Sequence, residues 1–162
     1  MRGRASDPGM AFNAPSLKGR ALRLLSQREH SRLELERKLA KHEEEPGTLA
    51  KALDELAAKD FISEPRVVAS VLNQRAARSG ALRVRQELQA KGIAPEAIAQ
   101  AVAGLQETEV ERATALWRRR FDAPPADAKA RAKQMRFLMA RGFSGAVVSK
   151  VLRSDFDEAA DE

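Results

Sequence analysis

One short segment recurs three times along this chain of 162 residues, and the recurrence limits the folds that the chain can adopt. Residues 82–93 place Val84 and Leu88 four positions apart, and therefore on one face of an α-helix. Gly92 follows the last turn, where a residue in the left-handed conformation commonly ends a helix. The pattern also lies 49 residues earlier, and again 50 residues later with Gly142 at the stop. A repeat of this length is typical of small helical modules that rest on their neighbours.

The helices that flank each copy repeat in the same order. Apolar residues recur at matching positions after the first and second copies: Leu49, Leu53 and Leu56, then Ile98, Val102 and Leu105. An arginine ends the helix before each copy: Arg28, Arg75 and Arg120. One amphipathic helix matches many others by chance, but three successive helices that match in order are a much less frequent coincidence. The sequence therefore predicts an all-α chain of nine helices, arranged as a tandem array of three three-helix repeats.

The predicted boundaries follow from these matches and from the turn residues. We expect a disordered leader, three units and an acidic tail at residues 1–16, 17–60, 61–106, 107–153 and 154–162. Serine or threonine begins several helices as an N-cap, and two of these residues have the spacing of a capping box. The expected caps are Ser31 with Glu34, Thr48, Ser63, Thr108 with Glu111, and Ser144. We expect the last helix to end near Arg153, with a frayed or disordered tail beyond it.

The amino-acid composition excludes several classes of protein. Six Phe, one Trp and no Tyr accompany an apolar content of mainly Ala, Leu and Val, which favours closely packed helices over a sheet core. The absence of cysteine excludes disulfides, thiol catalysis and cysteine zinc sites. Residues 1–16 lack the apolar core of a secretory signal, and no stretch approaches the roughly 18 apolar residues of a membrane span. We therefore expect a cytoplasmic protein that does not enter a membrane.

The residues that could carry chemistry are few and scattered. His30 and His42 are twelve positions apart, and neither has a second histidine at the spacing of a zinc pair. We expect both side chains at the surface. Residues 43–45 are glutamates, which are more typical of a solvated helix end than of a cation site. Because the chain also lacks a glycine-rich phosphate loop and a nucleophile motif, the sequence predicts no enzyme, no metal and no cofactor.

Positive charge is concentrated in the second and third units. Residues 64–153 hold 17 Lys and Arg against 8 Asp and Glu, whereas residues 1–63 hold 12 against 10. The candidate contact residues lie around the break before the central helix and along one face of the eighth helix: Arg75, Arg78, Arg83, Arg85, Lys129, Lys133 and Arg136. Such a surface can meet phosphates or a carboxylate-lined protein groove, or can serve solubility alone. We expect Trp117 and Phe121 in the core, because few aromatic residues accompany the bases as a stacking platform would require.

Four segments of the chain share features with one known family: residues 30–39, residues 62–66 followed by Arg75, residues 82–93, and residues 136–143. Together they resemble the signature of the RecX family, and the resemblance spans roughly residues 17–153. It implies an elongated, curved array of three-helix units and a non-enzymatic, usually inhibitory regulator of the RecA recombinase. It also implies a place in DNA recombination, DNA repair and the SOS response. Members of the family lodge in the groove of the RecA filament, hinder its growth and strand exchange, and have affinity for DNA.

The sequence departs from the family pattern at two points. Members of the family usually have an acidic pair and Arg-Phe-Ala after the position of Ile62, whereas residues 63–68 of this chain are Ser-Glu-Pro-Arg-Val-Val. Members of the family usually have a Tyr-Gly pair before the central helix, whereas residues 78–81 of this chain are Arg-Ser-Gly-Ala.

Three hypotheses for the function remain open. In the first, a monomeric protein occupies the groove of the RecA filament, or caps the filament end, through several weak charge contacts acting together. In the second, the basic face binds single- or double-stranded DNA without reading its bases. In the third, the chain is a helical scaffold for an unrelated protein. We expect a monomer because the chain has no heptad seam for a coiled-coil dimer.

Overall fold

The computed structural model describes residues 14–160, with side chains through residue 153, and in this range the chain forms nine α-helices and no strand. The helices are α1 (Leu17–Gln27), α2 (Arg32–Leu39), α3 (Thr48–Ala58), α4 (Glu64–Arg75), α5 (Ala81–Ala90), α6 (Pro95–Gln106), α7 (Glu109–Arg120), α8 (Ala128–Ala140) and α9 (Gly145–Ala160). A short 3₁₀ helix, η1 (Ala40–His42), directly follows α2. The predicted all-α chain of nine helices is confirmed. None of the helices in residues 14–160 combines the length and the apolar character needed to cross a lipid bilayer.

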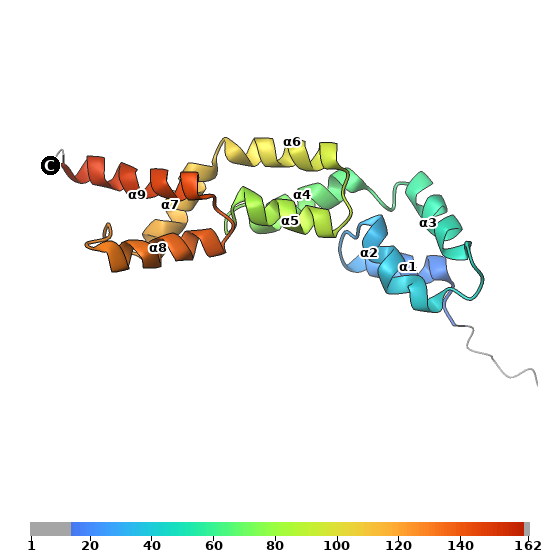
Figure 1. Ribbon diagram of the computed structural model, residues 1–162. Coiled ribbons are helices and arrows are strands. Elements are labelled where there is room, and N and C mark those ends of the chain that lie inside the picture. The colour runs from blue at the N-terminus through green and yellow to red at the C-terminus, as the bar shows by residue number, and fades with distance from the viewer. Residues whose placement is uncertain (1–13, 161–162) are drawn as a thin grey trace, which may run out of the picture.

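The three units lie in a row, and each consists of three helices that are consecutive in the sequence (Figure 1). The unit of α1 to α3 lies at one end and the unit of α7 to α9 at the other. In this view the first unit lies below the line of the other two, so the array bends between them. The predicted elongated, curved tandem array is confirmed.

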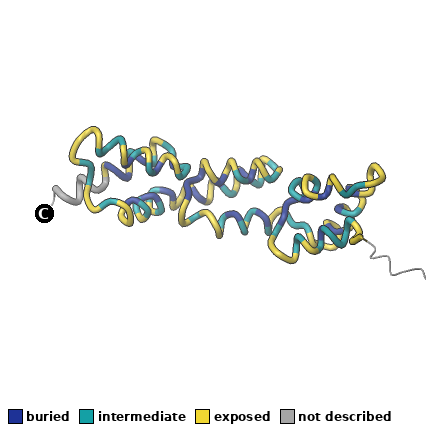
Figure 2. The backbone as a smooth tube through the Cα atoms, turned by 90° about the horizontal axis from the view of Figure 1, so that it is seen from below, coloured by how far each residue is buried: buried dark blue, intermediate teal, exposed yellow. Residues whose placement is uncertain are grey.

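Each unit has a hydrophobic core of its own, and the buried backbone in Figure 2 alternates with exposed positions along every unit. Leu39, Leu88 and Leu138 occupy equivalent positions in the three middle helices and are all buried. The core of the first unit has six buried apolar residues, against nine in the second, so the first unit buries less apolar surface of its own.

A polar residue interrupts this pattern in the third unit, where Gln134 takes the core position that Val84 holds in the second. Its side-chain oxygen accepts a hydrogen bond from the Nε1–H of Trp117 at 2.8 Å, and its amide donates to the carbonyl of Ala123 at 3.2 Å. Trp117 is buried, as predicted, and Phe121 packs against the same core. A buried indole needs an acceptor for its N–H, which explains why a glutamine stands among leucines here.

Several predicted helix ends are confirmed. The hydroxyl groups of Ser31, Ser63 and Ser144 accept hydrogen bonds from the backbone N–H groups three residues on, at 3.2 to 3.3 Å. The helix stops at Gly92 and Gly142 have φ angles of 72° and 88°, in the left-handed region that favours glycine.

One predicted N-cap is wrong, and a second begins its helix as expected but without the predicted side-chain bond. Thr48 is the first residue of α3, after Gly47, and the free N–H of Leu49 is bound instead by the carboxylate of Glu43 at 2.8 Å. One of the three glutamates therefore stabilises the start of α3 instead of being merely solvated. The hydroxyl of Thr108 caps no N–H of α7, so the predicted capping box with Glu111 does not form.

The first helix begins at Leu17, as predicted, whereas the end of the last helix differs from the prediction. Ser16, the last residue of the predicted leader, is the N-cap of α1 and accepts from the N–H of Gly19 at 3.0 Å. Residues 1–13 of that leader lie outside the described residues. The last helix does not end near Arg153, because the backbone of α9 stays helical to Ala160, within the predicted acidic tail.

Candidate partner-binding surface and the unit junctions

The middle helix of the third unit ends against the beginning of the middle helix of the second. The N–H groups of Gly80 and Leu82, at the start of α5, donate to the carbonyl oxygens of Arg141 and Gly142, just after α8, at 2.8 and 3.1 Å. A Cβ atom at Gly80 would overlap the backbone of Gly142, so a side chain there would force the two units apart. N–H groups at a helix start have no partner within the helix, and here the neighbouring unit supplies the acceptors.

A buried carboxylate completes this junction. Glu109, the first residue of α7, is only 5% exposed, and its Oε1 accepts from the N–H of Ala81 at 2.9 Å. The N-cap position of α5 is Gly80, which has no side chain to bind that N–H. Glu109 thus caps a helix of the neighbouring unit, at the end where the helix dipole favours negative charge.

Arg112, one turn further along α7, ties together the ends of two helices of the second unit. Its guanidinium donates to the carbonyl oxygens of Ala76, Ser79 and Leu105 at 2.6, 2.8 and 3.0 Å. Burial lowers the pKa of Arg112, and the charge of Glu109 opposes that change. The spacing of Arg112 in the sequence predicts only an exposed positive charge, whereas the structure makes it a link between units.

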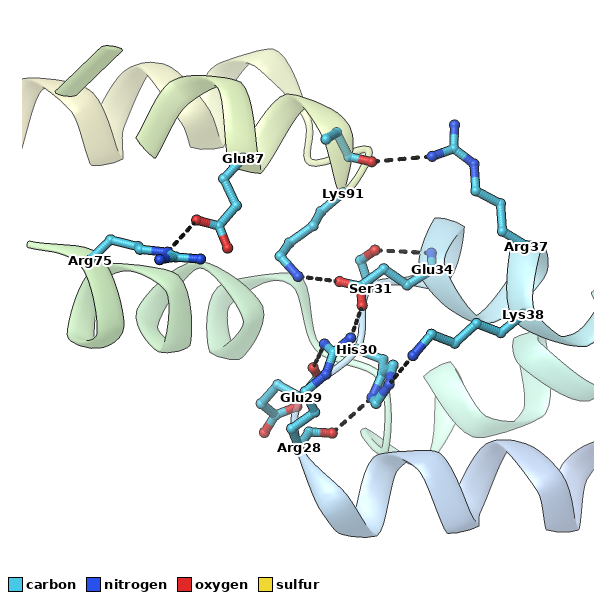
Figure 3. A network of polar contacts seen from close by, with 11 residues as sticks. Arg28, Glu29, His30, Ser31, Glu34, Arg37, Lys38, Arg75, Glu87 and Lys91 are labelled. Atoms are coloured by element: carbon cyan, nitrogen blue, oxygen red, sulfur yellow. Dashed lines mark hydrogen bonds and ion pairs between the residues drawn. The ribbon is translucent and has the colours of Figure 1, made fainter. Parts of the chain in front are cut away.

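The junction between the first and second units is built from side-chain ion pairs (Figure 3). The carboxylate of Glu34, near the start of α2, lies 2.6 Å from Nζ of Lys91 after α5 and 2.7 Å from the guanidinium of Arg28. Arg37 reaches the carbonyl of Ala90 at 3.5 Å. Burial raises the pKa of Glu34, but hydrogen bonds from Lys91 and Arg28 outweigh it, so the pKa is lowered overall.

The two junctions share one geometry and differ in chemistry. In both, the turn after a middle helix meets the start of the preceding middle helix, and Gly92 packs against Leu33 much as Gly142 packs against Arg83. Backbone hydrogen bonds and a buried carboxylate hold the second and third units together. Exposed and partly exposed ion pairs hold the first unit to the second. Such ion pairs weaken with salt, so the first junction is the more sensitive one.

His30, between α1 and α2, is buried and does not lie at the surface, contrary to the expectation from the sequence. Its side chain is 1% exposed, with Nδ1 3.0 Å from the carbonyl of Arg28 and Nε2 3.4 Å from Nζ of Lys38 (Figure 3). Burial lowers the pKa of His30, so the neutral ring is favoured with Nδ1–H as donor and Nε2 as acceptor. His42 is partly exposed, and no group of side chains suited to a metal ion occurs among the described residues.

The seven predicted contact residues are all exposed, but two of them are held by the protein itself. Arg75 pairs with Glu87 of α5 at 2.9 Å, in the same way that Arg28 pairs with Glu34 in the first unit. Arg83 donates to the carbonyl of Ala140 at 3.4 Å and so lies at the second junction. The other five point away from the three cores: Arg78, Arg85, Lys129, Lys133 and Arg136.

An exposed apolar pair accompanies these charges at the second junction. Leu82 of α5 and Met139 of α8 are 46% and 50% exposed. With Arg83, Gln86 and the turn after α8, they line a hollow of about 380 Å³. An apolar pair with a basic group beside it is typical of a surface that binds protein. The sequence pattern alone assigns Leu82 and Met139 to no site.

These features define a class of protein: a tandem array of three-helix units, docked end to end, with a charged and partly apolar outer surface. The chain matches the first, second and third three-helix domains of RecX over residues 18–56, 63–102 and 107–152. It is 56% identical to the regulatory protein RecX of Leptothrix cholodnii over 146 residues, which cover 89% of this chain and 93% of that protein.

The regulatory protein RecX of Ralstonia nicotianae is 49% identical over 138 residues, 85% of this chain and 87% of that protein. The crystal structure of RecX from Lactobacillus salivarius shares the fold, with a TM-score of 0.73 and 20% identity over 85% of this chain and 93% of the other. The chain belongs to the RecX family. Its relatives carry the name of a regulatory protein and not that of an enzyme.

Proposed function

We propose that this protein regulates RecA by binding in the groove of the RecA filament, where it limits filament growth and strand exchange. Membership of the RecX family supports the proposal, and so does the elongated body, which can span several subunits of a filament. Several weak interactions strengthen one another when they are held on one rigid support. The second and third units supply that support because backbone hydrogen bonds lock their junction.

The observation that carries the proposal is the surface around the second junction. Leu82 and Met139 offer an apolar centre, and Arg83 lies beside them in the same hollow. DNA phosphates gain little from an exposed leucine and methionine, whereas a protein partner buries them. This surface therefore favours a protein as the main partner, and we assign that role to RecA.

A RecA-dependent ATPase assay and a strand-exchange assay, with substoichiometric amounts of this protein, test the proposal. The informative variant carries Arg78→Glu and Arg85→Glu, whose side chains are exposed and form no ion pair with another unit among the described residues, and leaves Arg83 in its junction. Two such reversals should raise the amount needed for inhibition by roughly tenfold, equivalent to about 1.4 kcal/mol.

Lys51→Glu on α3 with Lys59→Glu at the C-cap of that helix makes the same change of charge in the first unit and is the matched control. The control should inhibit like the original protein, and circular dichroism should show equal helix content in all three. Equal inhibition by both double variants, or no effect of the original protein on RecA, would argue against the proposal.

A second function, direct binding of DNA, is favoured by α8. Lys129, Lys133 and Arg136 are exposed and share one face of that helix, where they can follow a phosphate backbone. Changing all three to Gln should flatten the plot of log affinity against log salt by about 0.9 for each phosphate that the variant no longer neutralises. Unchanged salt dependence would remove α8 from DNA binding.

A further inference from the structure

A groove in the first unit is lined by positively charged side chains, although acidic residues elsewhere in that unit balance this charge in its overall composition. The groove lies between α1 and the segment of α2 and η1, and its volume is about 480 Å³. Five basic side chains line it and no acidic one does: Arg20, Arg23, Arg37, Lys38 and Lys41. None of the five forms a salt bridge with a carboxylate among the described residues.

The five cations are not equally available. Lys38 approaches His30, and Arg37 reaches across to the second unit, so these two contribute mainly their stems to the groove (Figure 3). Arg20 uses its Nε–H on the carbonyl of Pro15 at 3.2 Å, which leaves its other N–H groups for a ligand. Arg23 is exposed one turn further along α1, on the same side of the helix.

The opposite wall adds Lys41 and His42 from η1. Burial lowers the pKa of His42, and the charges of Arg20 and Lys41 lower it further, so the local potential is positive. Neighbouring cations without a counter-ion repel one another, and a bound anion would relieve that repulsion. The planar guanidinium groups are suited to two parallel hydrogen bonds to a phosphate.

We propose that this groove binds a compact polyphosphate, either an inorganic chain or the phosphates of a nucleoside triphosphate. Its volume falls within the range of small-molecule sites, about 300 to 1,000 Å³. Linked phosphates place several negative charges close together, as the cluster of cations requires, whereas a nucleic-acid strand separates its phosphates by sugars. Leu24 and Leu39 add an apolar floor on which a base can lie.

The neighbouring hollow limits the length of the ligand. It has a volume of about 440 Å³ and shares Arg20, Lys41 and His42 with the groove, but Glu44 and Glu45 also line it. These carboxylates would repel a strand of phosphates that continued in that direction. The positive region is therefore short, which again favours a compact anion over a nucleic acid.

The two histidines allow a direct test in the protein alone, without RecA. In an NMR titration the ring signals report His42 in the groove and the buried His30 beside Lys38. Tripolyphosphate should raise the pKa of His42 clearly more than that of His30, which is buried and meets the groove only through Lys38. ATP in place of tripolyphosphate distinguishes the sources: equal affinity means that only phosphates are bound, and tighter binding of ATP adds the base on the apolar floor. Either result supports the proposal.

A variant with Arg23→Gln and Lys41→Gln should lose the response, and calorimetry should show at least a tenfold weaker affinity. Lys51→Gln with Lys59→Gln removes the same charge from α3 and its C-cap, and this variant should bind like the original protein. Equal loss in both variants would show a nonspecific charge effect and overturn the proposal. So would a response of His42 to a DNA strand but not to tripolyphosphate, or equal shifts of both histidines.

Discussion

Replacing Glu109 should destabilise the protein far more than replacing Glu111, although both are glutamates in the first turn of the same helix. Glu109→Ala leaves the N–H of Ala81 buried without an acceptor, which costs about 1–3 kcal/mol. It also removes the negative charge beside the partly buried Arg112. We therefore expect a loss of about 2–4 kcal/mol in the free energy of unfolding.

Urea unfolding followed by circular dichroism measures this loss, and amide hydrogen exchange locates it. The N–H of Ala81 should lose most of its protection in Glu109→Ala, because α5 then begins without a cap. Glu111 is exposed and is the matched control, since its replacement removes the same charge from the same helix dipole. Equal destabilisation by the two variants, within about 0.5 kcal/mol, would refute the role of Glu109 as the cap of α5.

Two further predictions concern the other junction and a glycine. The folded state lowers the pKa of Glu34, so the stability that its ion pairs contribute is present above the usual carboxyl pKa and is lost as the pH falls through the folded value. Glu34→Gln should therefore reduce the free energy of unfolding at pH 7 by about 1–2 kcal/mol. The variant should also lose less stability than the original protein between pH 7 and pH 3, as urea unfolding at the two pH values would show. An equal loss of stability in acid would contradict this. Gly142→Ala should cost about 1–3 kcal/mol, because φ is 88° and the new Cβ would collide with Arg83. Gly104→Ala, in open space on α6, should instead stabilise by about 0.5–1 kcal/mol, and similar melting temperatures for these two glycine variants would contradict the structural reason.

The sequence allowed the fold to be predicted because each helix carries its own signals. Serine caps, glycine stops and apolar residues four positions apart act over a few residues, and these local rules located helices such as α5 closely. The repeat then supplied the order of the units without any knowledge of how the units meet. The misplaced end of α9 and the failed cap at Thr48 show where a local rule met a competing group, such as the carboxylate of Glu43.

The candidate surface was harder to predict because it depends on interactions between residues far apart in the sequence. Arg112 and Arg85 look alike in the sequence, yet one binds three carbonyl oxygens inside a junction and the other is exposed. The sequence places His30 at the surface, but the turn between α1 and α2 folds it beneath Lys38. The basic groove escapes prediction because the acids of the first unit, many of them on α3 or in the turns, cancel its charge in a sum over the sequence.

The end-to-end docking of the middle helices also bears on how the chain acquires its shape during synthesis. The acceptors for the first N–H groups of α5 belong to residues 109, 141 and 142, which the ribosome adds later. When the last residue of the middle unit has been made, the first N–H groups of α5 therefore still lack these acceptors, which the next unit supplies. A nascent chain that stops between these units would expose backbone N–H groups without acceptors at Gly80 to Leu82, which a chaperone or another chain could bind.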